Sequence, residues 1–123
     1  MPLPSGEPNL ENPIQKMRDS GVGQPTTLSR IAPPEREYDG TRCLVYFDSV
    51  PGAKSYNVWV SPYEDGRGAD CLGQNWTASG QLLTGLNPGV PLYLFVTYVD
   101  KDGKPSKPSA ALRILLKDQF PFK

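Results

Sequence analysis

Histidine is absent from the 123 residues of the sequence. This side chain is the commonest general base, the commonest metal ligand and the group that titrates near neutral pH. Its absence excludes most hydrolase triads, because a serine or cysteine nucleophile lacks its usual base. The sequence also has no glycine-rich phosphate loop and no Cys-x-x-Cys pair. We predict no enzyme activity, no metal site and no cofactor, since the loop carboxylates are scattered: Glu64, Asp65, Asp70, Asp100 and Asp102.

An excess of charge of either sign is also missing. The 13 Lys and Arg residues balance the 13 Asp and Glu residues, and they form no basic cluster. A chain without a net field does not attract nucleic acid or anionic lipid. We therefore expect no nucleic-acid partner.

Long hydrophobic runs are missing too. No apolar stretch approaches the roughly 20 residues that a membrane-spanning helix needs. Residues 1–6 (MPLPSG) lack the basic start and apolar centre of a signal peptide. We expect no membrane partner. The polar, Pro-rich opening favours a start methionine placed on a segment of a longer, secreted protein, for which we expect an extracellular or periplasmic location.

Proline and glycine, by contrast, are abundant, with 14 and 12 residues. Both break helices, so they argue against a helical bundle and favour short elements joined by turns. Half of the prolines fall in the first 34 residues. This composition marks residues 1–26 as an arm or linker that differs from the rest of the chain.

A short helix is predicted within this arm. Asn12 has the side chain of an N-cap, Pro13 suits the first helical position and Gly21 supplies the stop. The helix is therefore expected over residues 13–20. An isolated helix of this length is unstable in water, so it must dock on another surface or fray.

From residue 27 onward apolar and polar residues alternate with a period of two, which is typical of half-buried strands. Turn residues separate the runs, and no long helix fits between them. The pattern predicts an all-β fold, an antiparallel sandwich of two sheets over residues 27–117, followed by a C-terminal tail at 118–123. The predicted strands span residues 27–32, 41–48, 55–61, 71–76, 81–84, 91–100 and 110–117.

The alternation also assigns one face of each strand to the core. A slip of one residue in the pairing of the strands would invert every assignment, so the list of core residues is a strict test of the predicted strands. The predicted core residues are Cys43, Val45, Phe47, Tyr56, Val58, Val60, Leu83, Leu86, Leu92, Leu94, Val96, Leu112 and Ile114.

Two stretches of the sequence resemble a fibronectin type III domain: VPGAKSYNVWVS at 50–61 and TGLNPGVPLYLFVTYVDKDGKPSKPSA at 84–110. The most specific feature is Leu86-x-Pro88-Gly89, followed by an alternating strand, a short turn with Asp and Gly, and Pro-Ser before the last strand. The similarity covers about residues 27–117. It implies a seven-stranded antiparallel immunoglobulin-like sandwich, here with a Pro-rich N-terminal arm that contains a short helix.

The sequence departs from this family in several places. Leu92 stands where the family has the tyrosine of its tyrosine corner, so we expect the corner hydrogen bond to be absent. The usual tryptophan of the second strand corresponds to Phe47, and a normally small position near the end of the sixth corresponds to Tyr98. We predict that Tyr98 fills part of the volume that the tryptophan leaves. The stretch at 67–70 (RGAD) is not an integrin-binding tripeptide, so integrin binding is not expected.

The two cysteines are too few for a disulfide framework. The predicted strands place Cys43 on a central strand, facing the core, and Cys71 on an edge segment. A disulfide needs two Cα atoms within about 7 Å of each other. We therefore predict that both thiols are free.

Strand alternation predicts a group of large apolar side chains on the outside of the sandwich. They lie on neighbouring strands of the family's fold, and an exposed group of this size needs a cover. A neighbouring domain, the chain's own arm and a sugar are the candidates, beside shielding by ordinary loops. This outer aromatic face comprises Trp59, Tyr93, Phe95 and Leu115, with Asn57 as a polar neighbour.

Two functions follow from these alternatives. The resemblance implies a non-catalytic spacer or docking module of a larger, secreted multidomain protein, for which a polysaccharide-active enzyme is a candidate parent. Its partner is then a neighbouring domain, and the chain itself is expected to be a monomer. The alternative is a glycan-binding module, in which Trp59, Tyr93 and Trp76 stack on sugar rings and Asn57 or Asn75 bonds to hydroxyls. Open rings favour the sugar, and rings buried beneath another segment favour docking.

Among the possible covers we predict the arm. The arm has a helix too short to be stable alone, and the sheet has a face too apolar to stand bare, so each surface completes the other. Residues 8–24 are expected to pack on the outer aromatic face and to bury Trp59 or Phe95 beneath Leu10, Ile14 and Met17.

Overall fold

The computed structural model describes residues 11–34 and 41–116. Residues 1–10 of the predicted arm and the predicted tail at 118–123 lie outside these ranges. Within them, the chain forms one helix and seven strands, in the order α1 (Pro13–Ser20), β1 (Leu28–Ala32), β2 (Cys43–Phe47), β3 (Ala53–Ser61), β4 (Asp70–Trp76), β5 (Gln81–Leu83), β6 (Leu92–Asp100) and β7 (Leu112–Ile114).

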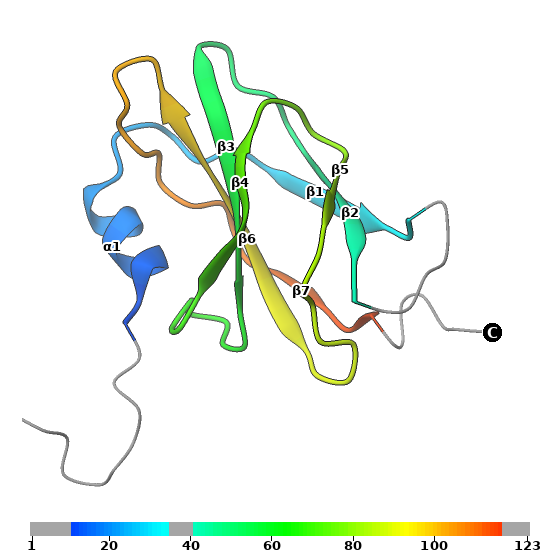
Figure 1. Cartoon of the computed structure of the whole chain (residues 1–123). Helices are drawn as coiled ribbons and strands as arrows, with labels where there is room; N and C mark the ends of the chain where they lie inside the picture. The colour runs from blue at the N-terminus through cyan, green and yellow to red at the C-terminus, as the bar shows by residue number, and fades with distance from the viewer. Residues whose placement is uncertain (1–10, 35–40, 117–123) are drawn as a thin grey trace, which may run out of the picture.

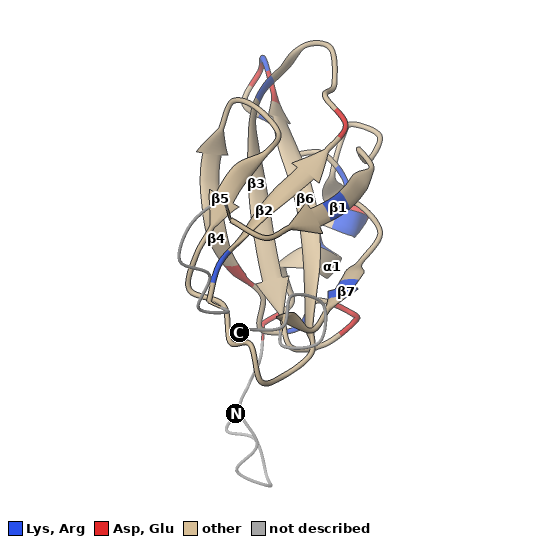
Figure 2. Ribbon diagram, turned by 90° about the vertical axis from the view of Figure 1, so that its right-hand side faces the viewer, with Lys and Arg blue, Asp and Glu red and all other residues tan. Residues whose placement is uncertain are grey.

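The strands form two antiparallel sheets, one of three strands in the order β1-β2-β5 and one of four in the order β4-β3-β6-β7. The sheets face each other, and α1 lies on the outer side of the four-stranded sheet (Figure 1). The predicted seven-stranded antiparallel sandwich with a short N-terminal helix is therefore confirmed. Figure 2 shows basic and acidic residues interspersed over helix, loops and strand ends in the described part of the chain.

The helix α1 forms where its capping residues indicated. The Asn12 side chain accepts a hydrogen bond from the Gln15 backbone N–H at 2.9 Å, and Pro13 occupies the first turn, where its missing N–H costs nothing. At the other end the Gly21 N–H donates to the Met17 carbonyl at 2.7 Å. The observed bounds, Pro13–Ser20, are the predicted ones.

The core between the sheets is the one that strand alternation predicts. Every predicted core residue is buried except Leu112, which packs against the core but is only partly buried. Leu92 is buried among them at the position of the tyrosine corner, and a leucine has no hydroxyl to make the corner bond. Two further residues of this core, Trp76 and Leu116, were not predicted.

Aromatic rings fill the centre of the core. Phe47 lies 4.6 Å from Tyr56 and 6.3 Å from Trp76, measured between ring centroids. Tyr98 meets Tyr56 edge-on at 6.3 Å, and its hydroxyl donates to the Gln24 carbonyl at 2.7 Å. Tyr98 thus lies in the core as predicted, but it is Trp76 that stacks on Phe47.

Irregular pairing explains why Trp76 turns inward. Between Trp76 and Gly73, β4 advances three residues while β3 advances two, from Tyr56 to Val58. Such an extra residue turns the following side chains to the other face of a sheet. Gly73 also leaves space that the indole fills, because a Cβ there would lie 2.8 Å from the Trp76 ring. The predicted sugar-stacking role of Trp76 is therefore wrong, since this ring is 8% exposed and belongs to the core.

The last strand begins at Leu112, two residues later than predicted, and serine side chains bind the edge of β6 ahead of it. The Ser106 and Ser109 hydroxyls accept hydrogen bonds from the Tyr98 and Val96 N–H groups, both at 2.9 Å. The backbone N–H groups of the same serines donate to the Tyr98 and Val96 carbonyls at 2.8 and 2.9 Å. Prolines, which cannot donate, precede both serines. The edge of β6 is satisfied in this way until β7 begins at Leu112.

Candidate interaction face

Strands β3 and β6 place the outer aromatic face on one side of the four-stranded sheet. Trp59 pairs with Phe95 in the register, and Ser61 pairs with Tyr93. Their chain neighbours Leu94, Val96, Val58 and Val60 belong to the core, so these side chains point to the opposite side, where α1 lies (Figure 1). Leu115 follows the end of β7 and is half-buried.

The rings of this face differ in exposure. Phe95 is 0% exposed although it lies outside the core between the sheets. Trp59 and Tyr93 are half-buried, and the Trp59 indole N–H donates to the Thr97 hydroxyl at 3.0 Å. Asn57 is half-buried as well, and its side-chain oxygen accepts from the Asn75 N–H at 3.0 Å. The face is therefore covered over Phe95 and only partly accessible around it.

The cover is the chain's own arm. Ile14 of α1 is 0% exposed and, like Phe95, lies outside the core between the sheets. Met17, one turn further on, is half-buried. Residues 11–24 pack on the sandwich as predicted, and Phe95 is the buried ring on the side of the sheet where α1 lies (Figure 1). Leu10 lies outside the described residues.

The loop at 62–69, between β3 and β4, holds the start of the arm. The Gly68 N–H donates to the Glu11 carbonyl at 2.7 Å, and the Asn12 amide donates to the Asp65 carbonyl at 2.9 Å. Gly66 has a φ of +92°, and a Cβ at this position would collide with the Ile14 side chain. A glycine is required there for its conformation and for the close approach of the helix.

The segment between β6 and β7 holds the end of the arm. The Val22 N–H donates to the Pro105 carbonyl at 3.0 Å, and the Lys107 N–H donates to the Gly23 carbonyl at 3.0 Å. Gly21 approaches so closely that a Cβ would lie 2.6 Å from the Lys107 nitrogen. The arm is thus fixed at both ends of the sheet.

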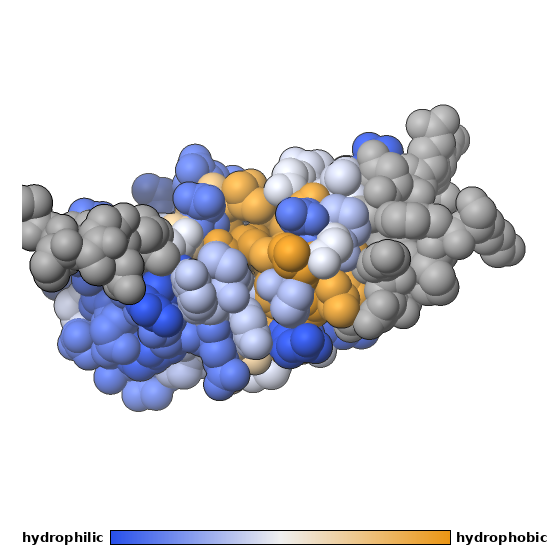
Figure 3. Space-filling model, turned by 90° about the horizontal axis from the view of Figure 1, so that it is seen from below, coloured by the Kyte–Doolittle hydropathy of each residue, from blue (hydrophilic) through white to orange (hydrophobic). Residues whose placement is uncertain are grey.

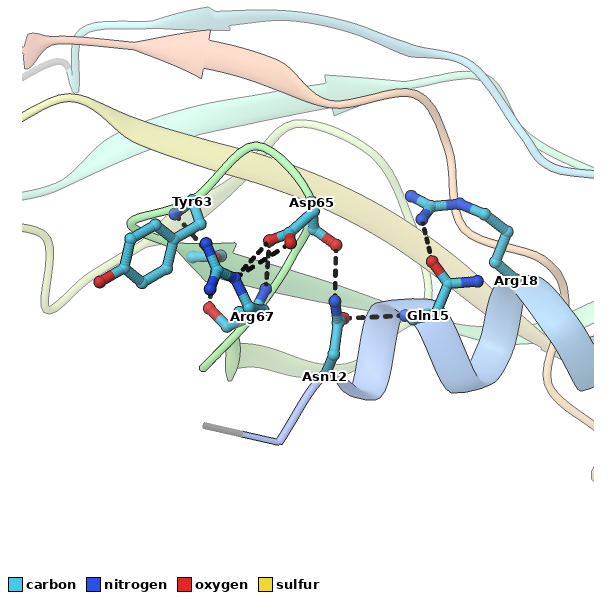
Figure 4. Close-up of polar contacts among 7 residues, drawn as sticks. Asn12, Gln15, Arg18, Tyr63, Asp65 and Arg67 are labelled. Carbon is cyan, nitrogen blue, oxygen red and sulfur yellow. Dashed lines mark hydrogen bonds and ion pairs between the residues drawn. The ribbon is translucent and has the colours of Figure 1, made fainter. Parts of the chain in front are cut away.

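The loop at 62–69 is itself braced by side chains (Figure 4). The Arg67 guanidinium pairs with the Asp65 carboxylate at 3.0 Å and lies over the Tyr63 ring, 4.5 Å from its centroid. The Arg67 backbone N–H donates to the same carboxylate at 3.0 Å and, more than the guanidinium charge, lowers the pKa of Asp65. An exposed ion pair adds little stability by itself. Its role is to hold the loop conformation that receives Asn12 and Ile14.

Replacing Asn12 by alanine should lower the free energy of unfolding by about 1 kcal/mol, because the helix loses its N-cap. The loss of the Asp65 contact acts in the same direction. Urea unfolding followed by tryptophan fluorescence measures the change. Lys16→Ala, an exposed substitution in the same helix, is the matched control, and an equal effect of the two variants would contradict the role of the cap.

The two cysteines lie in different sheets. Cys43 is buried in the central strand β2, Cys71 is half-buried in the edge strand β4, and both thiols are free, as the sequence predicted. Burial raises the pKa of Cys43 to about 12 and also raises the pKa of Cys71. A thiol reacts as its thiolate, so both side chains are expected to be inert in the folded chain.

A disulfide-exchange reagent at pH 8 should therefore modify Cys71 slowly and Cys43 only after unfolding. Denatured, unreduced chain should titrate two thiols. The raised pKa values also make the free energy of unfolding depend on pH. The contribution of the two buried thiols is fully present below the ordinary thiol pKa of about 8.5, and it is lost as the pH rises toward the pKa values of the folded chain. Rapid modification of Cys43 in the native chain would contradict the burial of β2.

Two antiparallel sheets of three and four strands around one core define the immunoglobulin-like class of β-sandwich. No family model matches the sequence, and none of the curated proteins matches it. Among solved structures, the chain is similar to the crystal structure of a Fn3-like protein from Clostridium thermocellum, with a TM-score of 0.61 and 28% identity over 76% of this chain and 92% of that one. The chain is a fibronectin type III-like domain.

The described residues include neither a membrane-spanning helix nor a cluster of metal-binding side chains. None of their helices is long and apolar enough to cross a membrane. No three of their His, Cys, Asp and Glu side chains gather where a metal ion could be held.

Proposed function

We propose that this chain is a non-catalytic docking or spacer module of a larger, secreted multidomain protein. A fibronectin type III-like fold is that of an accessory or structural domain and is typically non-catalytic. The proposed partner is a neighbouring domain of the parent protein, and a polysaccharide-active enzyme is the candidate parent. Nucleic acid and membrane are not among the proposed partners.

The observation that carries the proposal is the covered face. The large apolar surface that would serve a sugar as a platform is occupied by α1, with Phe95 and Ile14 both 0% exposed. A chain that closes its own aromatic face with a segment bound at both ends leaves that face without an open platform, which favours a non-catalytic docking or spacer module over a sugar-binding one. Nothing in this arrangement requires a small ligand.

Glycan binding is the less favoured function. Aromatic platforms for sugars need open rings, but Trp76 is in the core and Phe95 is covered. Trp59 and Tyr93 remain half-buried, and the oxygen of Asn57 already accepts a backbone hydrogen bond. Secretion is supported by the resemblance alone, since free thiols at Cys43 and Cys71 do not indicate an oxidising compartment.

Sequencing the gene on both sides of this segment tests the proposal. A domain encoded next door, with a signal peptide upstream, is the expected result, and an isolated gene of this length would contradict it. Native gel electrophoresis through soluble xylan, mixed-linkage glucan and hydroxyethylcellulose tests the alternative. We expect unchanged mobility, whereas retardation that Trp59→Ala abolishes and Val22→Ala leaves intact would favour a glycan-binding module.

A further inference from the structure

The arm brings the start of the described chain to the same end of the sandwich as its last described residue. At this end β3 finishes, β6 begins and β7 finishes, because Ser61 pairs with Tyr93 and Leu92 pairs with Ile114. The loop at 62–69 follows β3 here and binds Glu11. We call this end the exit pole. It is formed by the loops at 62–69 and 84–91 and by residues 114–116, and it is the lower end in Figure 1.

Without the arm, the chain would begin at the opposite end. The Thr26 hydroxyl donates to the Asp48 carbonyl at 2.6 Å, and Leu28 pairs with Phe47, the last residue of β2. Strand β1 therefore starts at the far end of the sandwich, and α1 carries the chain along the outer side of the sheet. The arm thus places residues 11 and 116 at one pole, where a sandwich without it has its ends at opposite poles.

Exposed apolar side chains collect at this pole. Val90 in the loop at 84–91 is 41% exposed, and Leu72, 38% exposed, has a methyl group 3.9 Å from where a Cβ of Gly85 would stand. Figure 3 views this pole and shows hydrophobic residues gathered at its centre, beside a hydrophilic area. Tyr63, 40% exposed, lies on the loop at 62–69. Of the other exposed large hydrophobics among the described residues, Leu82 lies on β5, and Val22 lies at the opposite pole, where its N–H binds the Pro105 carbonyl.

We propose that the exit pole is the surface on which the neighbouring domain of the same polypeptide docks, through an apolar patch of its own. This inference rests on the proposed function. Chain segments joined at residues 11 and 116 hold whatever follows them close to the pole, so docking is intramolecular and a modest apolar patch suffices. Tyr63 and Arg67 belong to residue types enriched in interface hot spots. Asp65 holds Arg67 in place in advance, and the Arg67 guanidinium lies over the Tyr63 ring.

Both described ends lie at this pole, at opposite sides of it (Figure 1). A chain segment therefore leaves the module on each side of the apolar patch, and either connection keeps a neighbouring domain close to it. This placement supports the docking role of the module.

The test uses the longer natural polypeptide, in which this chain is extended on both sides as its gene encodes. Val90→Lys places a charge on the exit pole, and Val22→Lys places the same charge on the opposite pole. In the chain alone both variants should leave the melting temperature unchanged, because both side chains are exposed. In the extended polypeptide, amide exchange at residues 86–92 should be slower than in the chain alone. Val90→Lys should restore it by on the order of tenfold, the change expected when an interface residue is lost.

Each outcome decides a different point. If the gene encodes no folded segment on either side, the proposed function fails. If a neighbouring domain exists but Val90→Lys and Val22→Lys give equal exchange rates, the docking surface lies elsewhere while the module function stands. If the chain alone sediments as a dimer that only Val90→Lys dissociates, the occupant of the pole is a second copy, and the neighbouring-domain proposal is overturned.

Discussion

We expect removal of residues 1–24 to lower the melting temperature of the chain and to make it self-associate. The deletion takes away α1 and with it the cover of Phe95, which is 0% exposed in the intact chain. The bared face joins Phe95 to Trp59 and Tyr93, an apolar surface of the kind that monomers rarely leave open. The Tyr98 hydroxyl also loses its acceptor on Gln24. Thermal unfolding and sedimentation velocity measure the two effects.

Ile14→Ala is the matched point variant. Truncating a fully buried isoleucine typically costs about 2–5 kcal/mol, but this residue belongs to a segment that can detach. Its cost therefore levels off at the free energy of docking, which is small because ordering the arm opposes the burial of its one apolar side. Lys16→Ala, on the exposed side of α1, should have little effect. If the truncated chain keeps its melting temperature and stays monomeric, the arm is only a linker.

The sandwich could be predicted because its core depends on strand alternation, a property of nearest neighbours in the sequence. Leu94 and Phe95 are adjacent and both are fully buried, yet alternation assigns them to opposite faces, and the structure places only Leu94 in the core. The helix could be predicted for a similar reason, since Asn12, Pro13 and Gly21 act through local backbone geometry. Neither inference required knowledge of the partners across the fold.

The features that escaped prediction depend on contacts between distant segments. Trp76 turns inward because β4 carries an extra residue opposite β3, and no local pattern reveals such pairing. The last strand begins at Leu112 instead of residue 110, and the edge of β6 ahead of it is bound by the hydroxyls of Ser106 and Ser109, which no local pattern indicates. Gly66 offers a third case, because one of the two reasons for its glycine is the approach of Ile14 from a segment 52 residues away.

The sequence predicted which residues share the outer aromatic face, but it did not predict how exposed each ring is. Alternation placed Trp59, Tyr93 and Phe95 on one face, and the poor stability of a short isolated helix indicated its cover. What the sequence could not give is how completely each ring is covered, since this depends on where α1 crosses the sheet. Phe95 is fully buried, whereas Trp59 and Tyr93 are half-buried.

Leu94→Ala should lower the free energy of unfolding by about 2–5 kcal/mol, a large share of the total stability of a small domain. Leu94 is 0% exposed at the middle of the sheet, paired with Val60 on β3 and Leu112 on β7, so its neighbours cannot collapse into the cavity. Leu82→Ala, on a 41% exposed side chain of β5, should stay within about 0.5 kcal/mol in the same urea unfolding experiment.

A comparison with Phe95→Ala in the chain lacking residues 1–24 separates the two faces of β6. There Phe95 has lost its cover, so its truncation should cost little and should reduce self-association. Leu94→Ala should cost as much as in the intact chain, because the core between the sheets does not depend on the arm. Equal losses for the two variants would place Phe95 between the sheets and overturn the register on which the outer aromatic face depends.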